Sequence, residues 1–320
     1  MQLRLRSLAT GTATFLPLIG KYANRRTGGT ESARYCYSVW MRHLAKAQTS
    51  GYSLIGTGRA IAELGPGDSL GTGLAAMLSG FEKYFALDVK VHANAERNLA
   101  IFQELLHLFS ERAPIPGEDE FPLVFPKLDD YSFPNRILTE RILKNALDPQ
   151  RIKAIEAAIQ RAGQEIESTI RIQYIAPWTD LSFLHPESVD LVFSQATLEH
   201  VDDIAVAYRA LHSYLRPGGL MSHTIDYKSH GLTRDWFGHW TIGDTSWYFV
   251  RGTRPYLINR LPHSAHLSAI EQAGLRVIMD VAERAPAPQR AILARRFLAL
   301  SDADLATCGT FILAMKPLPH

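Results

Sequence analysis

Cysteine is scarce in the 320-residue sequence, which contains only Cys36 and Cys308. These two lie far apart and form no C-x-x-C pair. The sequence therefore predicts neither a disulfide framework nor a thiolate metal site, and a reducing compartment fits best. A marked charge imbalance is also absent. The formal net charge of +2 is too small to indicate nucleic acid or a membrane surface as a partner.

Long apolar runs are missing as well. No stretch reaches the roughly 18 apolar residues that a membrane span needs. The N-terminus begins with basic residues and a mildly apolar run, but Gly11 and Pro17 interrupt that run and no convincing cleavage site follows. We expect a cytoplasmic protein without a transmembrane segment, whose N-terminal segment allows at most weak peripheral contact with a membrane.

Strands and helices alternate along the rest of the sequence, whose 46% hydrophobic and 21% charged residues suit a globular protein. Apolar patterning predicts seven strands, at 58–65, 83–89, 170–176, 189–196, 220–227, 275–282 and 309–316. This predicts an α/β fold with a doubly wound, mostly parallel seven-stranded sheet. The expected domain spans 51–320 and follows an N-terminal segment and covering helix over 1–50. It carries insertions at about 110–168 and 229–262, and the proline-rich stretch 112–135 is expected to be a surface loop or lid.

Glycines cluster between the first strand and its helix, in "IAELGPGDSLGTGLAAM" at residues 61–77. Such a turn lets backbone N–H groups face a ligand at a helix N-terminus. A dinucleotide site is disfavoured because Leu70 stands where the third glycine belongs and Asp68 would repel a pyrophosphate. A cofactor with a sulfonium and an ammonium group would instead be attracted by acids. Asp88, at the end of the second strand, suits ribose hydroxyls in either class.

Four motifs in this order, "AELGPGDSLG", "ALDV", "VDLVFSQATLEHVDD" and "LRPGGLMSHTID", resemble the class I S-adenosylmethionine-dependent methyltransferases over roughly residues 58–228. The resemblance implies a Rossmann-like methyltransferase fold with S-adenosyl-L-methionine as cofactor. It also implies which residues bind the cofactor. The methionine end would contact Glu63, Gly65 and Gly67, the ribose Asp88, the adenine Trp178, and the sulfonium side Ser194 and Gln195.

Two of these positions leave an alternative open. Ser69 occupies the position of the family's third glycine, and it is included among the cofactor-binding residues although its effect on the loop is undetermined. Trp178 is equally well explained as an ordinary core aromatic side chain.

Candidate catalytic residues follow the fourth and fifth strands. A hydroxyl acceptor would call for a general base, whereas a free amine or a carboxylate would not. His200, His223 and Asp226 are the candidates, although the "LEHV" of His200 also fits a structural or cofactor-side role. His223 and Asp226 are three residues apart and would face opposite sides of an extended strand. Both reach the cleft only if the strand ends near Thr224.

The stretch from 230 to 266 is rich in histidine, tryptophan and arginine. A metal site from His223, Asp226, His230 and His239 matches no established ligand spacing, so we predict no metal. A packed lid is one remaining interpretation. The other is a substrate pocket, with acceptor contacts from His230, Trp236, His239, Trp240 and Arg260.

The phrase "NRLPHSAHLSAIEQAGLRV" resembles the C-terminal part of bacterial methyltransferases associated with surface-polysaccharide assembly. We therefore expect O-methylation of a sugar or glycoconjugate precursor. Another small molecule or natural product is the alternative acceptor. An NAD-type oxidoreductase and a non-catalytic cofactor-binding scaffold are the alternatives of another class. Asp68 and Leu70 argue against the first, and the set Glu63, Gly65, Gly67 and Asp88 against the second.

Overall fold

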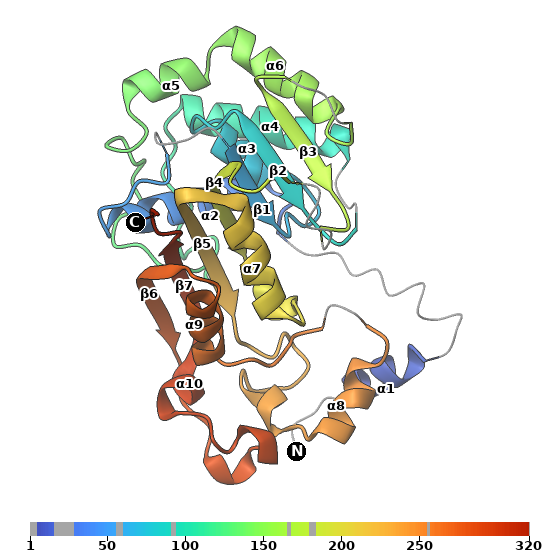
Figure 1. The fold of residues 1–320 in the computed structure, drawn as a ribbon. Coiled ribbons are helices and arrows are strands. Elements are labelled where there is room, and N and C mark those ends of the chain that lie inside the picture. Colours follow the sequence, from blue (N-terminus) through green and yellow to red (C-terminus); the bar gives the residue numbers. More distant parts are fainter. Residues whose placement is uncertain are drawn as a thin grey trace.

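A seven-stranded sheet forms the centre of the computed structural model, which describes residues 5–15, 29–55, 60–90, 94–164, 168–178, 184–254 and 257–319. The strand order is β3-β2-β1-β4-β5-β7-β6. The strands are β1 (Ala60–Leu64), β2 (Lys83–Leu87), β3 (Arg171–Ile175), β4 (Val189–Gln195), β5 (Leu215–Asp226), β6 (Arg276–Arg284) and β7 (Thr307–Met315). Only β7 runs against its neighbours, which confirms the predicted doubly wound, mostly parallel sheet (Figure 1).

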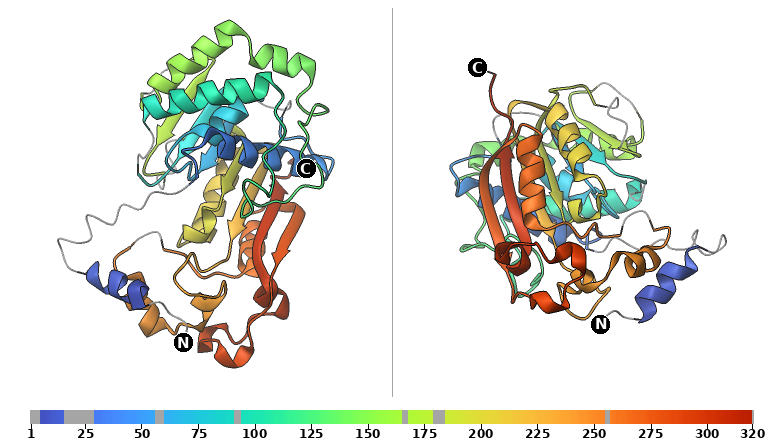
Figure 2. Two further views of the ribbon diagram at one scale, coloured as in Figure 1. Left: turned by 180° about the vertical axis from the view of Figure 1, so that it is seen from behind. Right: turned by 60° about the horizontal axis from the view of Figure 1, so that its bottom comes forward.

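Helices cover both faces of the sheet (Figure 1, Figure 2). One face packs against α2 (Ala33–Gln48), α3 (Gly71–Met77), α4 (Ala95–Ser110), α5 (Glu140–Ala146) and α6 (Pro149–Gln160). The other packs against α7 (Ile204–Tyr214) and α9 (His263–Gln272). Because helices bury both faces, all five residues of β1 are buried, as expected for a central parallel strand.

Local signals explain where the helices begin. Ser32 accepts a hydrogen bond from the amide of Tyr35 at the start of α2, and Asn94 caps α4 through the amide of Arg97. At α6, Asp148 is the N-cap and Pro149 takes the first helical position, where its missing N–H is harmless. The helix expected within residues 1–50 corresponds to α2, and α2 shares a hydrophobic core with the sheet.

The proline-rich stretch 112–135 is packed against α2 rather than free at the surface. Arg42 of α2 is fully buried. Its guanidinium donates to the carbonyls of Pro116 (3.1 Å), Val124 (2.6 Å) and Pro126 (3.3 Å). Because one buried cation holds three carbonyls of the stretch, we call this segment the strap: it has no helix or strand, as expected of a loop, but it is anchored to α2.

The fifth strand begins five residues earlier than the predicted 220–227. It begins at Leu215 and includes "RPGG", where Gly218 has φ +75° and the register with β4 shifts. It continues through Asp226, paired with Gly309 of β7, so it does not end near Thr224. His223 and Asp226 therefore face opposite sides of the sheet, and the idea that both reach one cleft was wrong.

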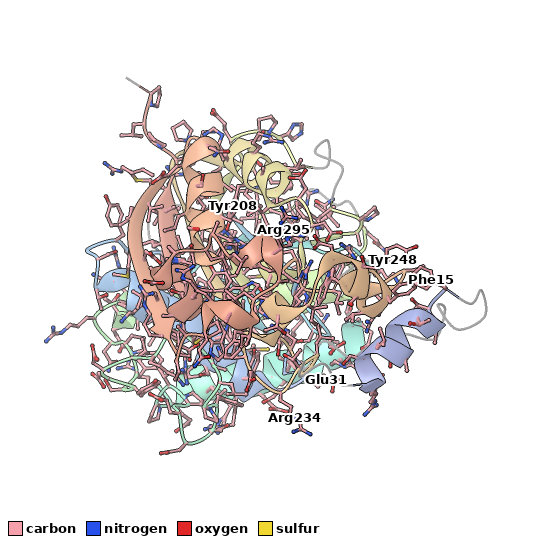
Figure 3. The ribbon with its side chains drawn as sticks, turned by 90° about the horizontal axis from the view of Figure 1, so that it is seen from below. Phe15, Glu31, Tyr208, Arg234, Tyr248 and Arg295 are labelled. Atoms are coloured by element: carbon pink, nitrogen blue, oxygen red, sulfur yellow. The ribbon has the colours of Figure 1, made fainter. Side chains whose placement is uncertain are left out.

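The second insertion lies beyond the carboxyl ends of the parallel strands, below the sheet in Figure 1. It contains the short helix η3 (Gly238–Thr241) and α8 (Asp244–Arg251). The N-terminal α1 (Leu5–Ala13) packs against α8. Just after α1, Phe15 lies beside Tyr248 of α8, with ring centroids 5.3 Å apart (Figure 3).

The remaining described elements are short. They are the 3-10 turns η2 (Leu198–His200), η4 (Arg290–Ile292) and η5 (Arg295–Phe297) and the helix α10 (Asp302–Ala306).

Two expectations about the chain's surroundings can be compared with this structure. Cys36 and Cys308 are both buried and unpaired, in agreement with the absence of a disulfide framework. Among the described helices, none has the length and apolar character that crossing a membrane requires. The boundary placed at residue 50 stays a prediction.

Candidate functional site

The glycine loop joins β1 to α3 and bends in the left-handed region. Gly65 has φ +71° and Gly67 has φ +76°, a backbone conformation that residues with a side chain rarely adopt. A Cβ atom added at Gly65 would lie 2.4 Å from Cγ2 of Thr197. The loop after β1 therefore touches the segment after β4, as expected where the strand order reverses and α/β sheets bind ligands.

Ser69 contributes to the loop through its side chain. Its hydroxyl donates to the carbonyl of Thr30 and accepts from the amide of Gly71 at 3.1 Å, at the start of α3. It also lies 4.0 Å from the sulfur of Cys36. The side chain is thus directed toward residue 30 and α2, where it caps α3 and ties the loop to the N-terminal part of the chain.

Glu63 supports the loop from within the core. Its carboxyl group is buried and accepts a hydrogen bond from the hydroxyl of Tyr84 on β2. Burial raises the pKa of Glu63 to about 8, and hydrogen bonds from Tyr84 and from Gly73 and Thr72 of α3 oppose that rise. A side chain engaged in this way holds β1, β2 and α3 together beneath the proposed methionine end of the cofactor.

Asp88 lies directly after β2, as predicted. Its Oδ1 atom accepts from the amide of Val89 at 2.6 Å, and its Oδ2 atom accepts from the hydroxyl of Tyr174 at 3.1 Å. The amide of Trp178 donates to the Asp88 carbonyl at 2.9 Å. These bonds orient the carboxylate at the carboxyl edge of the sheet. Trp178 itself is buried in a core cluster.

Ser194 and Gln195 end β4 but point to opposite faces. Ser194 is bonded to His223, with 2.7 Å between Oγ and Nδ1, and both side chains are fully buried. Gln195 turns to the α2 face, where its Oε1 accepts from Nε2 of His43 at 3.1 Å. Its amide nitrogen donates to the carbonyl of Phe125 in the strap. Both side chains thus make contacts inside the protein.

Four chemically active side chains meet where β4 and β5 end, and we call Glu199, His200, Asp226 and His230 the carboxylate–histidine cluster. The Nε2 atom of His230 lies 3.5 Å from Oδ2 of Asp226 and 3.8 Å from Oε1 of Glu199. The rings of His200 and His230 meet edge to face with centroids 5.0 Å apart. His230 has φ +48°, an unusual value that is often retained at functional sites.

The members of the cluster differ in their exposure to solvent. Glu199 is buried, whereas the side chain of His230 is 28% exposed. Burial raises the pKa of Glu199 well above its ordinary value, and the nearby Asp226 adds to this. Burial also lowers the pKa of His230. Asp226 in turn accepts from the amide and the ammonium group of Lys228, at 2.9 and 3.3 Å.

Asn259 of the second insertion holds the turn that carries Glu199 and His200. Its side-chain nitrogen donates to the carbonyls of Leu198 (3.0 Å) and Val201 (2.9 Å), and its amide donates to the carbonyl of Glu199 (2.7 Å). This residue begins the "NRL" phrase. The turn is therefore held by Asn259, through two side-chain bonds and one bond from its backbone amide.

The other residues expected to bind substrate form the interior of the second insertion. Arg260 is buried, stacks over Trp247 at 4.3 Å and donates to the carbonyl of Ile242 and to Asp244. Burial, the largest cause, lowers its pKa to about 10. Trp240 and His239 are also buried. Trp236, partly exposed, donates to the carbonyl of Pro286. Arg260, Trp240 and His239 are therefore packed inside the second insertion. Of the residues expected to bind substrate, only His230 belongs to the carboxylate–histidine cluster.

The residues present fit S-adenosylmethionine. The glycine backbone turns sharply at Gly65 and Gly67 next to Thr197, and an oriented carboxylate stands at Asp88. A carboxylate directly after the second strand suits the ribose hydroxyls of this cofactor.

Comparison with known proteins gives one family match. The family described as "Methyltransferase domain" matches residues 136–222, which include β3, β4, α7 and the turn at Glu199 and His200. The glycine loop and Asp88 lie outside the matched residues. The search of curated proteins returned no similar sequence.

Several solved structures are similar at low sequence identity. An S-adenosylmethionine-dependent methyltransferase from Mesorhizobium loti has 18% identity and a TM-score of 0.41, over 85% of this chain and 97% of that chain. One from Methanosarcina mazei has 11% identity and a TM-score of 0.42, over 83% and 96%. Phosphoethanolamine N-methyltransferase 2 from Haemonchus contortus has 14% identity and a TM-score of 0.43, over 89% and 57%. Such low TM-scores support no inference about a substrate.

The family match includes Glu199 and His200 of the cluster but not Asp226 and His230. The sheet is doubly wound and mostly parallel, as predicted from the motifs. Residues 136–222 thus match a methyltransferase domain, and this match supports an enzyme of the methyltransferase class.

Proposed function

We propose that the enzyme methylates a hydroxyl oxygen of a small-molecule acceptor bound at the carboxyl ends of β4 and β5. One observation carries this proposal. The segment that touches the cofactor loop at Thr197 continues directly into Glu199 and His200 of the carboxylate–histidine cluster. Groups able to orient a hydroxyl therefore lie within three residues of Thr197, which is next to the cofactor loop.

Asp226 is the proposed proton acceptor. Lys228 holds its Oδ1 atom, and its Oδ2 atom faces His230 at 3.5 Å. His230 and His200 would orient the acceptor hydroxyl beside it. A hydroxyl needs such help because its proton must leave as the new C–O bond forms, and alignment against the methyl group supplies much of the remaining acceleration.

A sugar or glycoconjugate precursor is the acceptor class that we favour. The "NRL" phrase is the part of the sequence that suggested this acceptor class. Its first residue, Asn259, holds the turn that carries Glu199. Residues of the aromatic-rich second insertion lie beyond the same strand ends (Figure 1). Partly exposed aromatic groups such as Trp236 provide flat apolar faces of the kind that stack on sugar rings.

A transfer assay tests this proposal. Methyl-labelled cofactor is incubated with activated sugars, lipid-linked glycans, natural-product phenols and alcohols, and primary amines. Label on a sugar hydroxyl is the expected result. Label on a non-sugar hydroxyl would support methylation of a hydroxyl oxygen but contradict a sugar acceptor. Label only on amines would contradict the whole proposal.

A further inference from the structure

Three donor side chains of the cluster converge on one point. One ligand atom each from Glu199, His200 and His230 lies within 4.8 Å of the others. We propose that these three residues bind a divalent transition-metal ion, at a site where the sequence pattern had favoured none. The ion-binding claim stands on its own, whereas its catalytic role rests on the proposed methylation of a hydroxyl.

The separations suit one shared ion. Ligands at about 2.0–2.2 Å from a metal ion stand roughly 3–4 Å from one another. His230 Nε2 and Glu199 Oε1 are 3.8 Å apart, inside that interval. All three ligand atoms lie within 4.8 Å of one another. Small side-chain rotations bring them to 3–4 Å, because the rings of His200 and His230 already meet edge to face.

The buried carboxylate of Glu199 is the independent sign that something binds there. Neither of its oxygens has a hydrogen-bond partner in the described parts of the chain. The amides of Glu199 and Asp226 lie near enough to affect its pKa, but they make no bond of good geometry to it. An unsatisfied buried carboxyl group is costly. Glu63, the other buried glutamate near the site, accepts a hydrogen bond from the hydroxyl of Tyr84. Its carboxyl group therefore has a partner within the protein, whereas that of Glu199 has none in the described parts of the chain.

The donor set indicates the kind of ion. Two imidazoles and one carboxylate suit zinc, manganese or iron(II), whereas magnesium and calcium prefer oxygen donors alone. Access is available because the His230 side chain is 28% exposed. The turn with Glu199 and His200 is held rigidly by Asn259, as a preorganised site requires.

The position of the site gives the ion a use. A divalent ion polarises a bound hydroxyl and makes its proton easier to remove. Asp226 lies beside it, with Oδ2 3.5 Å from His230 Nε2, to accept that proton. The acceptor oxygen would then form a bond to the methyl carbon of S-adenosylmethionine while the methyl–sulfur bond breaks, S-adenosylhomocysteine would leave, and Asp226 would hold the hydroxyl proton.

Direct metal titration tests the proposal. The full chain is treated with a chelator and dialysed, then titrated with Zn²⁺ by calorimetry and with Mn²⁺ by electron paramagnetic resonance. We expect one ion per chain. Glu199→Gln and His230→Gln should each weaken binding at least tenfold, in the range that lost coordination produces. His185→Gln, which changes an exposed histidine outside the cluster, should leave the affinity unchanged.

The results separate this proposal from the function. Absence of stoichiometric binding, or equal affinity in wild type, Glu199→Gln and His230→Gln, would overturn the metal site. Two cluster variants are used so that one can decide if the other fails to fold, with circular dichroism as the check. Metal binding without transfer to any hydroxyl would overturn only the proposed methylation of a hydroxyl acceptor. Unchanged transfer by the chelated enzyme, with no metal bound, would overturn only the catalytic role of the ion.

Discussion

His223 lies 2.7 Å from Ser194, Nδ1 to Oγ, on the face of the sheet that α7 and α9 cover. Asp226 lies three residues further along β5, faces the other side and joins the carboxylate–histidine cluster. The two residues had equal standing as catalytic candidates in the sequence. Their positions on a strand that runs through Asp226 give them different roles.

Asp226→Asn and His223→Gln should therefore differ in kind. Loss of a general base lowers kcat by about 10²–10⁴, so Asp226→Asn should do this without changing the affinity for S-adenosylhomocysteine. His223→Gln should lower stability by roughly 1–3 kcal/mol, because it disturbs a buried hydrogen bond, and keep kcat within about threefold. Steady-state kinetics and urea denaturation of both variants measure this. A larger fall in kcat for His223→Gln than for Asp226→Asn would reverse the assignment.

Ser69→Gly tests the loop's departure from the family pattern. Although it restores the expected glycine, it removes the cap on the Gly71 amide and the bond to Thr30. We expect a loss of about 1 kcal/mol in unfolding free energy and less than a threefold change in affinity for S-adenosylhomocysteine. Ser69→Ala is the matched control for backbone flexibility. A strong gain in affinity in Ser69→Gly would show that the serine obstructs the cofactor.

Gly65→Ala tests the contact between the loop and the segment after β4. The new Cβ atom would meet Thr197 at a residue with φ +71°. This should cost about 1–3 kcal/mol of stability and weaken cofactor binding at least tenfold. Thr197→Ala in the same chain removes the two nearest atoms and should restore part of the binding. Gly80→Ala, at φ +117° with open space around it, controls for backbone strain. Equal cofactor loss in Gly80→Ala would contradict the contact.

The buried His43 should make stability depend on pH. Its Nδ1 atom accepts from Ser222 and its Nε2 atom donates to Gln195, and burial lowers its pKa to about 4. Between pH 6.5 and 4 the unfolded chain binds a proton that the folded chain does not. The contribution of His43 to stability is thus lost as pH falls through that interval, by roughly 1 kcal/mol per pH unit.

Comparison with His43→Gln isolates this effect. Glu63, whose pKa is raised to about 8, acts in the opposite direction, since its contribution is lost as pH rises toward 8. Both chains contain Glu63, so its effect cancels in their difference. Urea denaturation between pH 5 and 8 should show that the advantage of wild type over His43→Gln shrinks below pH 6.5. A constant difference would mean that folding does not lower the pKa of His43.

Local patterning predicted much of this fold because its signals lie close together in the chain. The glycine turn, the acid after β2 and the apolar strand segments each need only a few neighbouring residues. The sheet order then follows from the right-handed connections of parallel strands. Cofactor residues such as Asp88 could be placed for that reason.

The rest depends on contacts between distant residues. Arg42 meets the strap more than 70 residues away, and Asn259 reaches the turn at Leu198 from the second insertion. Glu199 stood in the quoted "LEHV", yet only burial distinguishes its carboxyl group from an exposed one. The aromatic side chains of the second insertion looked like a pocket because sequence alone does not separate packing from binding.

Calorimetric titration with S-adenosylhomocysteine and with NADH, on wild type and Asp88→Ala, tests the central claim most directly. Wild type should bind S-adenosylhomocysteine and no NADH. Asp88→Ala should weaken that binding by about 1–3 kcal/mol, the loss expected when a charged hydrogen-bond partner is removed. Binding of NADH, or an unchanged affinity for S-adenosylhomocysteine in Asp88→Ala, would contradict the site.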